Sequence, residues 1–345
     1  MSKVKSKLPP LYHHFLPDLI EEDVPEETWA SCHTCTLCQS AQSPYVNTKC
    51  CAYFPSLYNY LIGGILQDTR PEMAEGKKRM KALIAAGVGV TPYGIVSPDW
   101  HTQEYRRVDN KSIQLQAELD PLLCPLYKSG TCTIWDYRGN LCSTYHCVSN
   151  AAVWGKKYWK TVNTYLKTVE HHLGNYALSS IGFNEKNLLK KHLKKYSLEF
   201  GKKKPMSGND NELWGEWINR KEELYVACYE YVMNLTQDSF DELIGEKHAK
   251  LITEMSSALV GFRENQIPEF LKWHPDVCLD RNTDGLVIVC LKEEKVEISP
   301  IVFNYLKKMD GTIPSKKIVD YGFEILLNLS HQMLDLYQKD MLRKF

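Results

Sequence analysis

The chain lacks both an excess of charge of one sign and a long hydrophobic run. Its 345 residues include 42 Lys and Arg and 42 Asp and Glu, which gives a formal net charge of zero. A balanced chain has no general attraction to nucleic acid or to anionic lipid. Its longest apolar stretches, such as residues 82–90 and 286–291, are far shorter than the roughly 20 residues that a bilayer requires. We therefore expect neither nucleic acid nor a membrane among its partners.

Two recognisable signals are also missing. The start of the chain is basic, but Pro9 and Pro10 follow where a signal peptide has its apolar segment, so we expect no secretion signal and a cytoplasmic location. Gly87 and Gly89 are not followed by the third glycine and the helix that a dinucleotide-binding loop needs. Without export, clustered cysteines are better explained as metal ligands than as disulfides, which leaves a secreted disulfide framework as the alternative.

Cysteine, by contrast, is abundant and clustered. Nine of the 12 cysteines fall into two dense groups. The first group opens as C-x2-C-x2-C, a spacing at which one tight loop directs consecutive sulfurs toward one centre. The second group is more widely spaced, and no catalytic residue is evident beside either. The candidate metal ligands are Cys32, Cys35, Cys38, Cys50 and Cys51 in the first group and Cys124, Cys132, Cys142 and Cys147 in the second.

The kind of metal follows less directly from these thiols. Soft thiolates bind zinc and iron–sulfur clusters alike. Three cysteines at this spacing with a remote fourth are typical of ferredoxin-type clusters, and Cys124-Pro125 supplies a Cys-Pro step. Zinc sites more often pair as C-x2-C…C-x2-C, which is missing here. We favour an iron–sulfur cluster of the 4Fe–4S type, with zinc as the alternative. One or two centres, and the choice between Cys50 and Cys51 as ligand, stay open.

The second cysteine group also carries a recognisable order of residues. Cys124-Pro125 is followed by Gly130-x-Cys132-x-Ile134-Trp135, then by Arg138, Cys142 and Cys147. Together with the first group, this order resembles the YkgJ-type cysteine-cluster family, described as zinc- or iron-chelating proteins, over about residues 31–150. The resemblance implies a metal site without fixing a reaction. One branch of that family, the flagellin lysine methylases, transfers a methyl group to a protein lysine, but nothing here outside the thiols matches it.

The C-terminal segment follows a different pattern. Residues 286–291 and 296–299 predict a β-hairpin, followed by helices over 300–308 and 316–321 and a last helix to about residue 342, with a turn at 310–312. The stretch from Ile298-Ser-Pro through Asp310-Gly311-Thr312 to Ile318 resembles PqqD-like winged-helix peptide-recognition domains. That resemblance implies a peptide bound as an added strand at a sheet edge. A winged helix used only for packing is the alternative.

Hydrophobic periodicity predicts helices over much of the remaining chain. Pro71 and Gly87 mark the start and end of one of them, and Ser239 with Glu242 fits a capping box, with Asp238 as the alternative cap. Short strands are expected within residues 88–108. The predicted helices cover residues 55–67, 71–86, 149–173, 211–235 and 239–262.

These patterns predict a mainly α protein with a small α+β part. A loop-rich, cysteine-ligated metal domain would be followed by a helical middle and by a winged-helix-like hairpin with three helices. The expected units are an N-terminal arm (1–30), a cysteine-cluster metal-binding domain (31–175), a helical region (176–280) and a winged-helix-like domain (281–345).

Three functions are compatible with such a chain. The first is an iron–sulfur protein that modifies a protein or peptide substrate by group transfer or redox chemistry. The second is a non-catalytic, zinc-stabilised scaffold or peptide-binding protein, because a structural zinc site is closed by four protein ligands. The third is metal delivery or storage. Whether the chain is an enzyme, its substrate and its oligomeric state stay open at this point.

Overall fold

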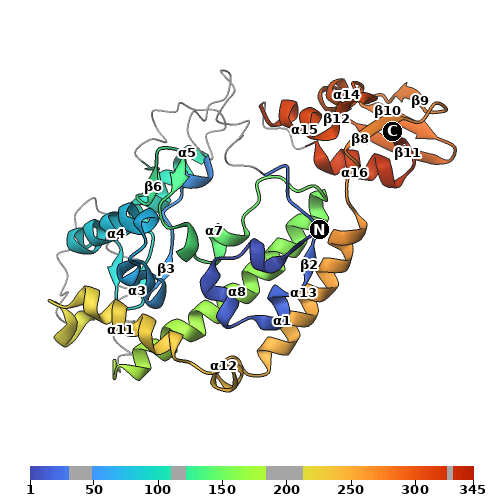
Figure 1. Ribbon diagram of the computed structural model, residues 1–345. Helices are drawn as coiled ribbons and strands as arrows, with labels where there is room; N and C mark the ends of the chain where they lie inside the picture. Colours follow the sequence, from blue (N-terminus) through green and yellow to red (C-terminus); the bar gives the residue numbers. More distant parts are fainter. Residues whose placement is uncertain (31–48, 110–121, 184–212, 325–328) are drawn as a thin grey trace.

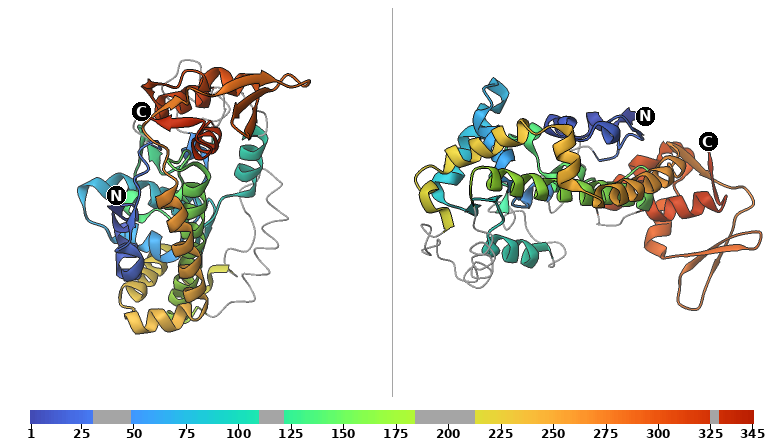
Figure 2. Two further views of the ribbon diagram at one scale, coloured as in Figure 1. Left: turned by 90° about the vertical axis from the view of Figure 1, so that its right-hand side faces the viewer. Right: turned by 90° about the horizontal axis from the view of Figure 1, so that it is seen from below.

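The computed structural model describes residues 1–30, 49–109, 122–183, 213–324 and 329–345 (Figure 1). In these residues the chain is mainly helical and has five small sheets of two or three strands. This confirms the predicted class, mainly α with a small α+β part. The long helices α8 (Ala152–Ser180) and α13 (Lys247–Glu264) lie side by side, and the C-terminal elements gather at one end of this pair (Figure 2).

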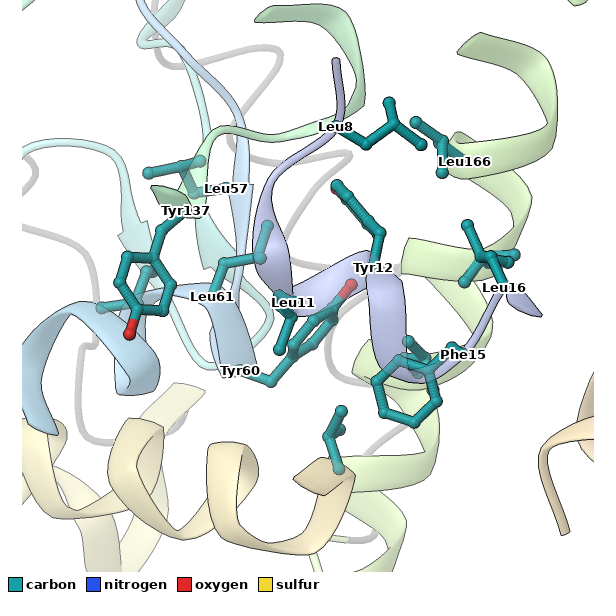
Figure 3. Packing of buried hydrophobic residues seen from close by; sticks show 14 of the residues in the cluster. Leu8, Leu11, Tyr12, Phe15, Leu16, Leu57, Tyr60, Leu61, Tyr137 and Leu166 are labelled. Carbon is teal, nitrogen blue, oxygen red and sulfur yellow. The ribbon is translucent and has the colours of Figure 1, made fainter. Parts of the chain in front are cut away.

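The N-terminal arm belongs to the first hydrophobic core. Figure 3 shows Leu11 and Tyr12 of the arm in one cluster with Tyr60 and Leu166, which come from two later helices. Burying these side chains holds the arm against the body of the protein, since apolar burial is the main stabilising term in folding. The elements of the arm are β1 (Ser2–Lys3), η1 (Val4–Ser6), η2 (Pro10–His14), α1 (Pro17–Ile20) and β2 (Asp23–Val24), with β1 and β2 antiparallel.

Helix α3 (Asn59–Gln67) is apolar on most sides because other elements enclose it. Its residues are buried from Asn59 to Leu66, and it packs against α11 (Lys221–Met233). A Cβ atom on Gly63 would lie 1.9 Å from the carbonyl oxygen of Tyr225, so the glycine allows the two backbones to touch. The helix expected from residue 55 begins later, because residues before it form a strand of the sheet β3-β5-β4. These strands are β3 (Leu57–Tyr58), β4 (Val90–Thr91) and β5 (Gly94–Ile95).

The helix expected over residues 71–86 is confirmed. It consists of η4 (Pro71–Met73) and α4 (Ala74–Ala86), and it ends at Gly87, whose φ of 65° is the left-handed cap conformation. Strands β4 and β5 agree with the strands expected within residues 88–108. The end of that stretch, for which no strand was specified, forms helix α5 (Asp99–Asp109). Pro98 and Asp99 are a helix-start signal that outweighs the β-favouring residues before them.

The helical middle differs in detail from the predicted pattern. The expected boundary between residues 175 and 176 lies inside α8. Gly245, with φ 65°, divides the expected helix 239–262 into α12 (Gln237–Ile244) and α13. The cap of α12 is Thr236, whose hydroxyl accepts from the Ser239 N–H at 3.3 Å, so the predicted Ser239 capping box is wrong. None of the helices among the described residues is both long and apolar enough to span a bilayer.

The C-terminal domain is built on a second hydrophobic core and two three-stranded sheets, ordered β11-β10-β9 and β12-β8-β13. The predicted hairpin is confirmed as an antiparallel pair, β10 with β11. Residues 310–312 form part of a strand instead of the expected turn, and the last helix ends at Gln338 before a final strand. The elements are β8 (Phe270–Trp273), β9 (Cys278–Arg281), β10 (Val287–Leu291), β11 (Glu294–Ile298), α14 (Pro300–Leu306), β12 (Asp310–Pro314), α15 (Ser315–Glu324), α16 (Ser330–Gln338) and β13 (Leu342–Lys344).

Candidate metal centre

The structure places part of the predicted ligand set. Cys51 lies in the 3-10 helix η3 (Lys49–Ala52), Cys132 in β7 (Thr131–Cys132) and Cys142 in α7 (Asn140–Thr144). Cys124 and Cys147 lie in loops. Cys32, Cys35 and Cys38 are outside the described residues, as is the side chain of Cys50.

A tight hairpin positions Cys132. Strand β6 (Tyr127–Lys128) pairs with β7, and the two residues between them, Ser129 and Gly130, have φ values of 48° and 84°. Positive φ at both positions is the type I′ turn that suits the twist of a two-residue hairpin. Helix α4 supports the hairpin, since Arg79 Nη1 donates to the carbonyl oxygen of Pro125 at 2.9 Å.

Within the described residues, Cys51 of the first cysteine group lies beside the second group. The backbone N–H of Cys124 donates to the carbonyl oxygen of Cys51 at 2.5 Å. Cys142, Cys132 and Cys51 each help to raise the pKa of the Cys124 thiol, and Cys132 and Cys51 likewise help to raise the pKa of Cys142. These four thiols therefore lie close enough together to influence the ionisation of Cys124 and Cys142. Cys147 packs against the second hydrophobic core, whereas Cys124 and Cys132 pack against the first.

The chemistry of these thiols suits a cation that binds sulfur. Desolvation, followed by the neighbouring Cys132 thiol, raises the pKa of Cys142 to about 12. Burial likewise raises the pKa of Cys124 to about 12. Neutral thiols would become thiolates only if a metal supplied the compensating positive charge. Among the described residues, no three Cys, His, Asp or Glu side chains already enclose a single ion, so the sulfurs would have to draw closer on binding.

A buried carboxylate fixes the short helix that carries Cys142. Glu170 of α8 is 1% exposed. Its Oε1 accepts from the Asn140 backbone N–H at 2.6 Å and from the Tyr12 hydroxyl, and its Oε2 accepts from Asn140 Nδ2 at 2.6 Å. A carboxylate at the start of a helix satisfies N–H groups that have no partner within the helix. Glu170 thus anchors the first turn of α7, two residues before Cys142.

Glu170 was not identified from the sequence. The available signal was a charged residue on the core-facing side of the predicted helix 149–173, beside Leu166 and Val169. Glutamate is almost never fully buried unless it is paired, so its presence there indicated a polar partner. The partner itself could not be read from the spacing, because Tyr12 and Asn140 come from distant parts of the chain.

A cavity of about 1080 Å³ adjoins this arrangement. It lies against α7, α8 and the β3-β5-β4 sheet, and Cys142 forms part of its wall. Its lining combines aromatic rings with hydrogen-bonding and cationic groups, which could contact a substrate. Residues of the wall include Cys142, Asn140, Glu170, Tyr58, Lys167 and His171. At least one of the clustered thiols therefore faces a space large enough for a substrate side chain.

We expect Glu170 to make the stability of the folded protein pH-dependent. Desolvation raises its pKa from 4.5 to about 7, against hydrogen bonds from Tyr12 and Asn140 that lower it. Between these pH values the folded protein keeps a proton that the unfolded chain has lost, so stability falls as pH rises and levels off above the folded pKa. The shift corresponds to about 3 kcal/mol.

The variant Glu170→Gln cannot ionise and serves as the comparison for that effect. Urea unfolding of both proteins at a series of pH values from 5 to 8 would measure the free energy of unfolding. The wild type should lose stability relative to Glu170→Gln across this window. Parallel pH profiles would show that Glu170 titrates in the folded protein as it does in the unfolded chain.

The comparisons with known proteins add no relative. A scan of protein-family models, a search of curated proteins and a search of solved structures each gave no match to this chain. The resemblance to the YkgJ-type family therefore stays a prediction that rests on the cysteine spacing and the residues around it.

Proposed function

We propose that this chain is a cytoplasmic metal-binding protein that holds an iron–sulfur cluster, of the 4Fe–4S type, through its clustered cysteine thiolates. The proposal is supported chiefly by the hydrogen bond that holds Cys51 beside Cys124, and by the mutual electrostatic influence of Cys51, Cys124, Cys132 and Cys142. Soft thiolates in such a group are the ligands that these clusters use.

The cavity favours a reactive centre over a closed structural one. A structural zinc site has four protein ligands and no open position, whereas Cys142 lies in the wall of the cavity. A bound cluster would supply electron-transfer or group-transfer chemistry at that wall. The protein's own residues would bind and orient the substrate: Lys167, His171 and Tyr58 line the space, and Glu170 keeps α7 in place.

The C-terminal domain favours a protein or peptide as the substrate. Strand β9 is an edge strand, and all four of its residues are exposed. An exposed edge offers backbone N–H and C=O groups to which an extended peptide can add as a further strand. In this proposal the domain holds the substrate and the cavity receives the side chain to be modified.

Metal and sulfide analysis of the full chain, purified without oxygen, tests the proposal. We expect a brown protein with absorption near the blue end of the visible spectrum and with iron and acid-labile sulfide in similar amounts. A colourless protein that contains zinc would support the alternative, a zinc-stabilised scaffold or peptide-binding protein. A protein with neither metal would contradict both.

A further inference from the structure

Cys278 and Cys290 form a second thiol pair, separate from the candidate metal ligands. They lie directly opposite each other on the antiparallel strands β9 and β10. Directly opposite residues in such a pair point to the same face and have Cα atoms about 4.5–5.5 Å apart. A disulfide spans Cα separations of about 4.4–6.8 Å. The backbone therefore already holds these two thiols at a distance at which they could be linked.

The side chains are also in contact. The Cys278 thiol donates to the carbonyl oxygen of Cys290 at 3.6 Å, and it also acts on the ionisation of the Cys290 thiol. Desolvation and the neighbouring Cys278 thiol raise the pKa of Cys290. Lys295, which lies directly opposite Cys290 on β11, lowers this pKa. Asp280 raises it further. The two thiols thus lie close enough to influence each other across the β9–β10 pair.

The pair is open to small reagents from one side. Cys278 is exposed on the edge strand β9, and Cys290 is half-buried on the central strand of the same sheet. Cys228, which is fully buried in the first core, gives the contrast within this chain. Thiol–disulfide exchange requires access as well as a thiolate, so Cys278 is the member of the pair that would react first.

We propose that Cys278 and Cys290 are a reversible redox pair, oxidised to a disulfide by a low-molecular-weight disulfide such as oxidised glutathione. The Cys278 thiolate attacks one sulfur of the oxidant, forms a mixed disulfide and releases one reduced thiol. The Cys290 thiolate then attacks the Cys278 sulfur and releases the second reduced thiol. The protein loses two protons and two electrons, and the oxidant gains both. The new bond ties the exposed edge strand β9 to β10.

Peptide mapping of the full chain tests this pair directly, because trypsin separates the two cysteines. Cleavage after Lys272, Arg281 and Lys292 gives the peptides 273–281 and 282–292, each with one cysteine. The protein is equilibrated in glutathione buffers of increasing oxidised fraction, and unreacted thiols are then alkylated at once. We expect the two peptides to become joined as one species that dithiothreitol separates, while Cys228 stays reduced.

Two outcomes would overturn the proposal. One is that peptides 273–281 and 282–292 stay separately alkylated under the most oxidising buffer. The other is that each carries glutathione without becoming joined to the other, which would show that the thiols react independently. The variant Cys290→Ser is the matched control, since it should stop at the mixed disulfide on Cys278. The wild-type result decides the question even if that variant folds poorly.

Discussion

In the proposed function, a serine in place of Cys132 or Cys142 should leave the purified protein without metal. Cys124, Cys132 and Cys142 all have raised pKa values, so we expect them to ionise and bind a cation only as a complete set that shares its charge. A serine hydroxyl is not a soft ligand and stays protonated at neutral pH. We expect iron, sulfide and visible absorption to fall to background in both variants after purification without oxygen.

The control for this loss is Cys278→Ser. It makes the same chemical change at an exposed cysteine on β9, outside the predicted ligand set, and should keep the full metal content.

A matching change at Cys35, which lies outside the described residues, distinguishes one metal centre from two. If Cys35→Ser and Cys132→Ser each remove a different part of the iron, the chain holds two centres. Full iron content in Cys132→Ser would contradict the assignment of this ligand.

Adding one methyl group at Gly63 should destabilise the fold strongly. A Cβ at this position would lie 1.9 Å from the carbonyl oxygen of Tyr225, so the α3 and α11 backbones would have to separate. Both helices are fixed by the surrounding core, and overpacking of this kind costs about 3 kcal/mol at the upper end of its usual range. We expect Gly63→Ala to lower the free energy of unfolding by about that amount in urea titrations.

The neighbouring variant Gly64→Ala is the comparison for this prediction. Its Cβ would meet the ring of Tyr137, with Cε1 at 2.4 Å, instead of a backbone atom. A side chain can shift more easily than a helix backbone, so Gly64→Ala should cost less than Gly63→Ala. Equal losses in the two variants would show that the helices separate readily and that close backbone contact is not required.

Local signals in the sequence were sufficient for several elements. The helical stretch formed by η4 and α4 begins at Pro71 and ends before Gly87, as expected. A proline suits a first helical turn, and a glycine suits a left-handed cap. The hairpin of β10 and β11 followed from two β-favouring runs close together in the chain. In each case the residues that specify the structure are neighbours in sequence.

Elements that depend on distant partners were missed. Strand β13 pairs with β8, about 70 residues earlier, and neither carries a regular alternation of apolar and polar residues. Strand β9 is exposed at all four positions and gives no burial pattern. The same limit applies at the candidate site, where the thiols were predicted but the anchoring carboxylate of Glu170 was not. The partners of Glu170, Tyr12 and Asn140, come from distant parts of the chain and meet it only in the folded protein.

Helix α8 runs from the second hydrophobic core to the cavity, and its length gives the scale of the reach that the proposed function requires of a substrate. Ala152 at its start belongs to the second core, while Glu170 lines the cavity. Eighteen helical steps separate them, or about 27 Å along the axis. An extended tail needs about eight residues to bridge that length. In the proposed function, shorter peptides held at β9 should escape modification, and a length series would reveal the threshold.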